Sequence, residues 1–136
     1  MLRYYRVFNV DQCEGIEAPI DENVETIDFQ PIEEAEKIAK GYKRAPKIGH
    51  GEARAYYQPA SDKINMPKPE TFHSEEEYYS TLYHEMTHST GHEARLNRKT
   101  LTDLCPFGSS NYRKEEPIAE MGAAFLCGHA ATDSRC

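Results

Sequence analysis

The chain contains an H-E-x-x-H motif at residues 84–88, inside a segment that carries strong helix signals. Ser74 precedes this segment and Glu77 follows three residues later, which forms an S-x-x-E capping box that satisfies backbone N–H groups at a helix start. Helix-forming residues continue up to Gly91, which stands where a left-handed residue commonly ends a helix. The sequence therefore predicts a helix over 74–90 that carries the motif.

The two histidines of this motif point to a metal site. His84 and His88 are four residues apart, so they lie one turn apart on the same face of the helix. Two imidazoles in this arrangement can share one ion at about 2.0–2.1 Å from each nitrogen. Glu85 follows the first histidine and can take a proton from water on the open side of the ion. We therefore predict Zn²⁺ as the cofactor and Glu85 as a catalytic general base.

A catalytic zinc site needs a third protein ligand, and residues near the motif are poor candidates. The metzincin pattern H-E-x-x-H-x-x-G-x-x-H is matched through Gly91, but its last position is Ala94. On a continued helix, His92 would lie about 12 Å along the axis from His84, too far to share an ion. A turn at Gly91 leaves His92 open as a ligand, although a loop or cleft position is favoured.

The last helix, predicted near 112–128, supplies better candidates for the third ligand. Glu116 and Glu120 are four residues apart and project from one face. Glutamate-type zincins use such a pair, one carboxylate on the metal and one that orients a histidine from behind. We predict Glu116 as the metal ligand and Glu120 as the orienting carboxylate, with the reverse assignment open. Three apolar residues at helical spacing predict that this helix is buried: Ile118, Met121 and Phe125.

Three further residues are candidates for the same site. Tyr112 lies one turn before Glu116 and could stabilise an oxyanion, although a tyrosine in such a place is more often a packing residue. Arg95 and Arg98 follow the motif closely. They either line the cleft or form ion pairs with the many acidic side chains, and ion pairing is the favoured interpretation.

The remaining segments predict a small sheet and one more helix. The aromatic, β-prone residues 4–10 predict a strand, and apolar spacing after Pro31 predicts a helix over 31–40. Residues 53–57 and 63–66 flank a turn-prone stretch and predict a β-hairpin. Two long helices after a sheet indicate an α+β fold, and the length of 136 residues fits a single domain over 1–136.

The composition of the chain argues against several classes of function and of metal site. A net charge of −7 argues against direct nucleic-acid binding by this domain, because such binding depends on Lys and Arg against phosphates. No apolar run approaches the ~20 residues of a membrane span, and no signal peptide is evident, so we expect a cytoplasmic protein without membrane attachment. The four cysteines form no C-x-x-C pair, which removes the usual thiolate zinc sites: Cys13, Cys105, Cys127 and Cys136.

Several segments together resemble the C-terminal zincin-like domain of ArdC-type antirestriction proteins: residues 5–13, 78–92, 95–98 and 115–127. The Glu116-x-x-Ala119 pattern also resembles the third-ligand helix of ImmA/IrrE metallopeptidases, which favours Glu116 as the ligand. This resemblance implies a zinc-dependent zincin-like fold, association with mobile elements and interference with host restriction. Full-length members carry an N-terminal single-stranded-DNA-binding domain, which we expect this chain to lack. Pro117 departs from the family's aliphatic residue, which fits a helix that begins there.

Three functional hypotheses follow. The first is a zinc-dependent metallopeptidase that hydrolyses a peptide or protein substrate with Glu85 as base. The second is a non-catalytic antirestriction module that binds a partner as a decoy and holds at most a structural metal. The third is a fragment that works only when joined to a DNA-binding partner.

Overall fold

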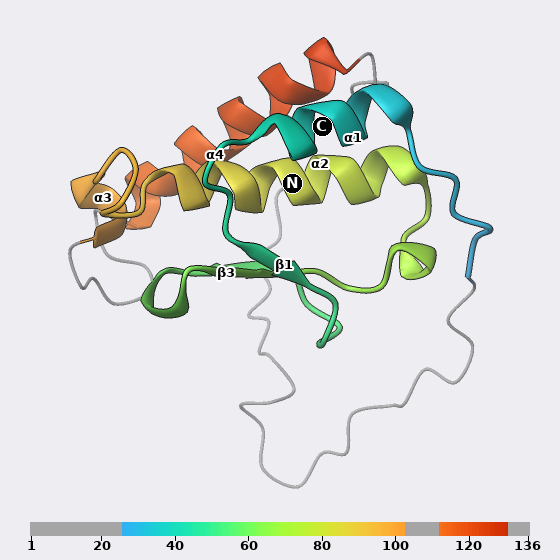
Figure 1. Cartoon of the computed structure of the whole chain (residues 1–136), viewed down its shortest axis with the longest axis horizontal. Helices are drawn as coiled ribbons and strands as arrows, with labels where there is room; N and C mark the ends of the chain where they lie inside the picture. Colours follow the sequence, from blue (N-terminus) through green and yellow to red (C-terminus); the bar gives the residue numbers. More distant parts are fainter. Residues whose placement is uncertain (1–25, 103–111, 131–136) are drawn as a thin grey trace, which may run out of the picture.

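The computed structural model describes residues 26–102 and 112–130, with the side chains of residues 112 and 113 left out. The strand predicted over 4–10 lies outside the described residues. Within them, a central helix is packed between a small sheet on one side and two further helices on the other (Figure 1). In chain order the elements are α1 (Glu33–Gly41), β1 (Lys47–Gly49), β2 (Tyr56–Gln58), η2 (Pro59–Ser61), β3 (Lys63–Asn65), η3 (Pro69–Thr71), α2 (Glu75–Thr90), α3 (Lys99–Thr102) and α4 (Tyr112–His129). The α+β class is confirmed, and no helix among the described residues is long and apolar enough to cross a membrane.

The three-stranded sheet has the order β1-β3-β2. β2 pairs antiparallel with β3 in a register that sets Tyr56 opposite Asn65, so the predicted hairpin is confirmed with shorter strands. Its turn is a 3-10 segment that ends at Asp62, which takes the left-handed conformation with φ 48°. β1 pairs parallel with β3 on the far side, which leaves β2 at one edge of the sheet.

The helix that carries the motif begins where the capping signals place it. The Ser74 Oγ accepts a hydrogen bond from the Glu77 backbone N–H at 3.3 Å. The Glu77 carboxylate accepts from the backbone N–H of His73 at 2.9 Å, one residue earlier than the capping box predicts. Both bonds satisfy N–H groups at the helix start, and α2 then runs for 16 residues.

The left-handed conformation predicted for Gly91 is wrong, because Gly91 has φ −75° and continues the right-handed path. A different constraint explains the glycine. The chain turns back here, and the backbone N–H of Arg98 donates to the Gly91 carbonyl at 2.9 Å. A Cβ at this position would lie 2.9 Å from the Arg98 guanidinium carbon. Glycine therefore leaves room for the Arg98 guanidinium, which any larger residue would force to shift.

Tyrosine-rich packing forms the core on one face of α2. Tyr79 and Tyr83 are fully buried, and each directs its hydroxyl to α1. The Tyr79 hydroxyl donates to the Glu36 carboxylate at 2.7 Å and the Tyr83 hydroxyl donates to the Ala35 carbonyl at 3.1 Å. These bonds satisfy the polar ends of side chains whose rings fill the interior. The other buried apolar residues of this core include Ile64, Met66, Tyr78, Leu82 and Met86.

The fourth helix, α4, packs against α2 through its small residues, so the predicted apolar face is wrong. Ala119 is fully buried, and Ala123 and Cys127 are nearly so. The predicted apolar face points outward instead, with exposures of 37% for Ile118, 61% for Met121 and 74% for Phe125. Small side chains allow two helix axes to approach closely. In this protein the small residues of α4 therefore face α2, and the larger apolar residues face outward. The helix also begins before Pro117, which lies inside it rather than at its start.

Gly122 marks the closest approach of the two helices. A Cβ there would lie 2.4 Å from the Thr87 Cγ2, on the helix that carries the motif. We expect Gly122→Ala to lower the free energy of unfolding by about 1–3 kcal/mol through overpacking. Gly128 lies on the same helix with nothing within 4 Å of its Cβ position. Gly128→Ala should instead be neutral or stabilise the protein by up to about 1 kcal/mol. Urea denaturation measures both variants, and equal changes in their free energies of unfolding would contradict a close approach at Gly122.

Candidate metal centre

Three predicted ligands converge between α2 and α4. The Nε2 atoms of His84 and His88 lie 3.0 Å apart. The Glu116 carboxylate reaches both, with 3.7 Å from Oε2 to the His84 Nε2 and 3.5 Å from Oε1 to the His88 Nε2. Among the described residues, these three form the group whose ligand atoms all lie within 4.8 Å of one another.

The spacing of these atoms fits one metal ion. A tetrahedral ion bound at about 2.0–2.1 Å sets its ligand atoms roughly 3.3 Å apart. The two histidine nitrogens lie 3.0 Å apart, and each lies 3.5 or 3.7 Å from a different oxygen of the Glu116 carboxylate, which is close to that value. Two imidazoles and one carboxylate also match the donor set of catalytic zinc sites. The side chains of His84, His88 and Glu116 can therefore hold a divalent ion without rearrangement of the two helices.

The other predicted carboxylate, Glu120, lies on a different side of His84. Its Oε1 is 3.3 Å from the Nδ1 of His84, the nitrogen that points away from the other two ligands. Its side chain is 69% exposed, against 35% for Glu116. This geometry favours Glu116 as the ligand and Glu120 as the carboxylate that orients His84 from behind.

Glu85 lies beside this group and is only 8% exposed. Burial raises the pKa of its carboxyl from 4.5 to about 7, with a smaller contribution from the negative charge of Glu116. A hydrogen bond from the Tyr57 backbone acts in the opposite direction. A carboxyl with a pKa near neutrality is suited to general acid–base work at physiological pH.

An open cleft of about 740 Å³ gives access to these groups. The edge strand β2 and the turn after it form one wall, and α2, α3 and the start of α4 form the others. His92 lines the cleft but does not belong to the group of ligand residues, in agreement with the favoured prediction of a loop or cleft position. The side chain of Tyr112 lies outside the described residues, so its predicted role stays a prediction. Other lining residues are Ala55, Tyr56, Tyr57, Glu93 and Leu101.

Comparison with known proteins agrees with this geometry. Residues 33–135 match the family model described as a zincin-like metallopeptidase. The chain belongs to this family. It is 38% identical to the Mn(II)-bound crystal structure of the antirestriction protein ArdC from plasmid R388, with a TM-score of 0.59 over 93% of this chain and 45% of that one. The metal-free ArdC structure gives 39% identity and a TM-score of 0.56.

Two sequence relatives are larger proteins. A DNA primase TraC of Escherichia coli is 40% identical over 122 residues, which cover 88% of this chain and 11% of the relative. The uncharacterized protein y4eC of Sinorhizobium fredii (strain NBRC 101917 / NGR234) is 34% identical over 130 residues, 92% of this chain and 38% of the relative. The chain thus spans less than half the length of each of these relatives. The expected similarity to an ArdC-type zincin-like domain is confirmed.

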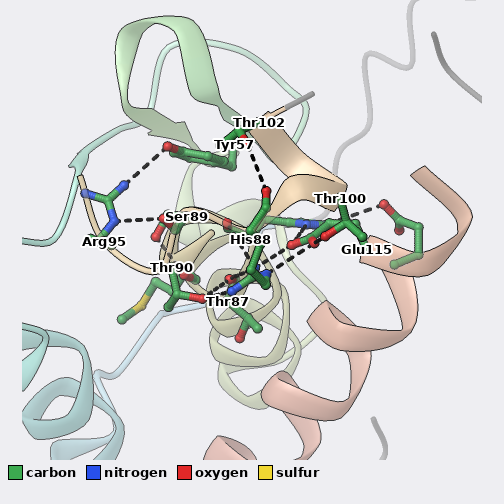
Figure 2. Close-up of polar contacts among 12 residues, drawn as sticks. Tyr57, Thr87, His88, Ser89, Thr90, Arg95, Thr100, Thr102 and Glu115 are labelled. Atoms are coloured by element: carbon green, nitrogen blue, oxygen red, sulfur yellow. Dashed lines mark hydrogen bonds and ion pairs between the residues drawn. The ribbon is translucent and has the colours of Figure 1, made fainter. Parts of the chain in front are cut away.

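In this zincin-like domain, both arginines after the motif are pairing residues, as the sequence favoured. Arg95 forms an ion pair with Asp62 and donates to the Ser89 carbonyl at 2.8 Å. It also donates to the Tyr57 hydroxyl at 3.2 Å (Figure 2). These bonds tie the β2–β3 turn to the end of α2 and thereby fix the strand that walls the cleft.

One acidic residue of the site was missed by the sequence prediction. Glu115 is 2% exposed and accepts hydrogen bonds from Arg98 and Thr100. Burial alone would raise the pKa of its carboxyl, but the bonds from Arg98 and Thr100 outweigh burial and lower it. Its Oε1 lies 3.6 Å from the Nδ1 of His88. Only its position next to Glu116 could have drawn attention to it in the sequence.

Proposed function

We propose that this chain is a zinc-dependent peptidase domain of an antirestriction-type protein. His84, His88 and Glu116 hold the ion, and Glu85 acts as the general base. The observation that carries the proposal is the position of the buried Glu85 carboxyl. It lies in an open cleft beside three side chains whose ligand atoms converge, and burial raises its pKa to about 7. A purely structural metal site has no need of an open approach or of such a base.

Zinc fits the donor set better than manganese, because imidazole ligands favour zinc and manganese favours oxygen ligands. When bound, the ion supplies a Lewis acid that polarises a carbonyl and makes water more acidic. Glu85 is placed to accept a proton from water in the cleft and to pass it to the leaving amine. A hydrogen bond from the backbone of Tyr57, which lines the same cleft, favours the charged form of this carboxyl.

The edge strand β2 supports a peptide as the substrate. Among the described residues, β2 pairs only with β3, and Ala55, Tyr56 and Tyr57 line the cleft. An extended peptide can add to a free strand edge through main-chain hydrogen bonds. Such a peptide would run past the carboxyl group of Glu85.

Glu85→Gln tests the catalytic part of the proposal. The amide keeps the shape of the side chain but cannot accept the proton, so we expect hydrolysis of a fluorogenic peptide mixture to fall by about 100- to 10,000-fold. The zinc content should stay at the wild-type level. Glu76→Gln, which removes a charge about two and a half turns earlier on the same helix, is the matched control and should cleave as the wild type does. Equal cleavage by the Glu85→Gln protein would contradict the proposal.

The same variant separates catalysis from a decoy role. If protection of DNA against a restriction enzyme depends on hydrolysis, it should disappear with Glu85→Gln. Protection that persists in a protein unable to hydrolyse peptides would assign the antirestriction effect to binding alone.

A further inference from the structure

The ring of His88 lies between two consecutive carboxylates of α4. Glu116 Oε1 approaches its Nε2 at 3.5 Å, and Glu115 Oε1 approaches its Nδ1 at 3.6 Å. The Nδ1 atom is buried and has no hydrogen-bond partner among the described residues. A buried nitrogen left unpaired is unfavourable, and Glu115 is the carboxylate that faces it.

The position of the proton on His88 decides whether the ring can bind a metal. A neutral imidazole carries its proton on one nitrogen and offers a lone pair on the other. Binding through Nε2 therefore requires the proton on Nδ1, and an acceptor beside Nδ1 favours that tautomer. A shift of about half an ångström would bring Glu115 within hydrogen-bond distance of Nδ1.

Glu115 cannot turn away from His88, because Arg98 and Thr100 hold both of its oxygens. Arg98 donates to Oε1 through Nη2 and to Oε2 through Nε, the latter at 3.2 Å. The Thr100 hydroxyl also bonds to Oε2. In Figure 2, Thr100 and Glu115 lie together where the start of α4 meets the end of α2.

Arg98 connects this carboxylate to the helix of the motif. Its guanidinium donates to the Thr87 carbonyl at 2.9 Å and to the Thr90 hydroxyl. Gly91 leaves the room for it, since a Cβ there would lie 2.9 Å from the guanidinium. One arginine thus fixes Glu115 relative to the turns of α2 on either side of His88.

We propose that Glu115 is a positioning residue that keeps the proton of His88 on Nδ1, with Arg98 and Thr100 holding Glu115 in place. The inference rests on the proposed metal site and assigns it an orienting carboxylate different from Glu120. In the metal-free protein, the 3.0 Å contact between the two Nε2 atoms accommodates a single proton. Glu115 is 3% exposed in its side chain and Glu120 is 69% exposed, so the buried carboxylate acts on its histidine with less screening. The shared proton therefore belongs to His84, and His88 is the acceptor.

Glu115→Gln tests this inference through the tautomer itself. The Arg98 Nε and the Thr100 hydroxyl both bond to Oε2, whereas the Arg98 Nη2 alone bonds to Oε1, so the amide oxygen keeps more of these bonds at Oε2. The amide NH₂ then replaces Oε1, next to the Nδ1 of His88, and the Nη2 bond is lost. An NH₂ group donates, which turns Nδ1 into the acceptor and moves the proton to Nε2. Long-range ¹H–¹⁵N NMR of ¹⁵N-histidine-labelled, metal-free protein reports this directly. We expect Nδ1–H in the wild type and Nε2–H in Glu115→Gln.

The second readout is zinc affinity, measured by chelator competition. Loss of an orienting carboxylate weakens metal binding by about 10- to 100-fold. Glu120→Gln is the matched control for the NMR readout, not for zinc affinity: it removes the same charge beside His84 and should leave the tautomer of His88 unchanged. The NMR measurement needs no metal, so failure of the wild type to bind zinc would overturn the proposed function while this inference is still decided. A wild-type His88 protonated on Nε2, or the same His88 tautomer in wild type and Glu115→Gln, would overturn the inference.

Discussion

The metal-free protein is expected to lose about 3 kcal/mol of stability as the pH rises from 4.5 to 8, through Glu85 alone. Burial raises the pKa of this carboxyl from 4.5 to about 7 in the folded protein. The protonated form is therefore favoured by folding. Its contribution is fully present below pH 4.5, where the unfolded chain is also protonated, and is lost as the pH rises through about 7.

Glu85→Gln provides the comparison for this effect, because glutamine does not titrate. Urea denaturation in the presence of a chelator should give similar free energies for the two proteins near pH 4.5. At pH 8 the variant should be more stable than the wild type by about 3 kcal/mol. If the difference in free energy of unfolding between the two proteins stayed constant from pH 4.5 to pH 8, burial would not be disfavouring the charged form of Glu85.

The second large effect distinguishes the two carboxylates of α4. Glu116→Ala removes a carboxylate whose two oxygens lie 3.7 Å from the His84 Nε2 and 3.5 Å from the His88 Nε2, whereas Glu120→Ala removes one that faces the Nδ1 of His84. An orienting residue is worth about 10- to 100-fold in metal affinity, so loss of a ligand should exceed 100-fold. Chelator competition gives the zinc dissociation constant of each variant. A larger increase for Glu120→Ala than for Glu116→Ala would show that Glu120 is the ligand and Glu116 the orienting residue.

The site on α2 was predictable because its information is local. His84 and His88 lie on one face through helical spacing alone, and the signals at Ser74 and Glu77 set the start of the helix. The spacing of Glu116 and Glu120 likewise predicted that both project from one face of their helix. Each of these predictions needed only the period of a helix and the chemistry of the side chains.

Features that depend on contacts between distant segments were not predictable in this way. β1 has only three residues, all exposed, and it forms through parallel pairing with β3. The buried face of α4 depends on how closely α2 approaches it at Thr87, so Gly122 and the alanines pack inward while Met121 and Phe125 point outward. Glu115 acquires its role only when Arg98 folds back onto it.

Zinc stoichiometry tests the metal centre most directly. Purified wild-type protein, saturated with zinc and freed of excess ion, should retain one zinc per chain, and His88→Ala should retain none. His92→Ala is the matched control, since His92 lines the cleft without belonging to the ligand cluster, and it should retain the ion. Equal zinc content in the wild type and His88→Ala would contradict a metal centre formed by His84, His88 and Glu116.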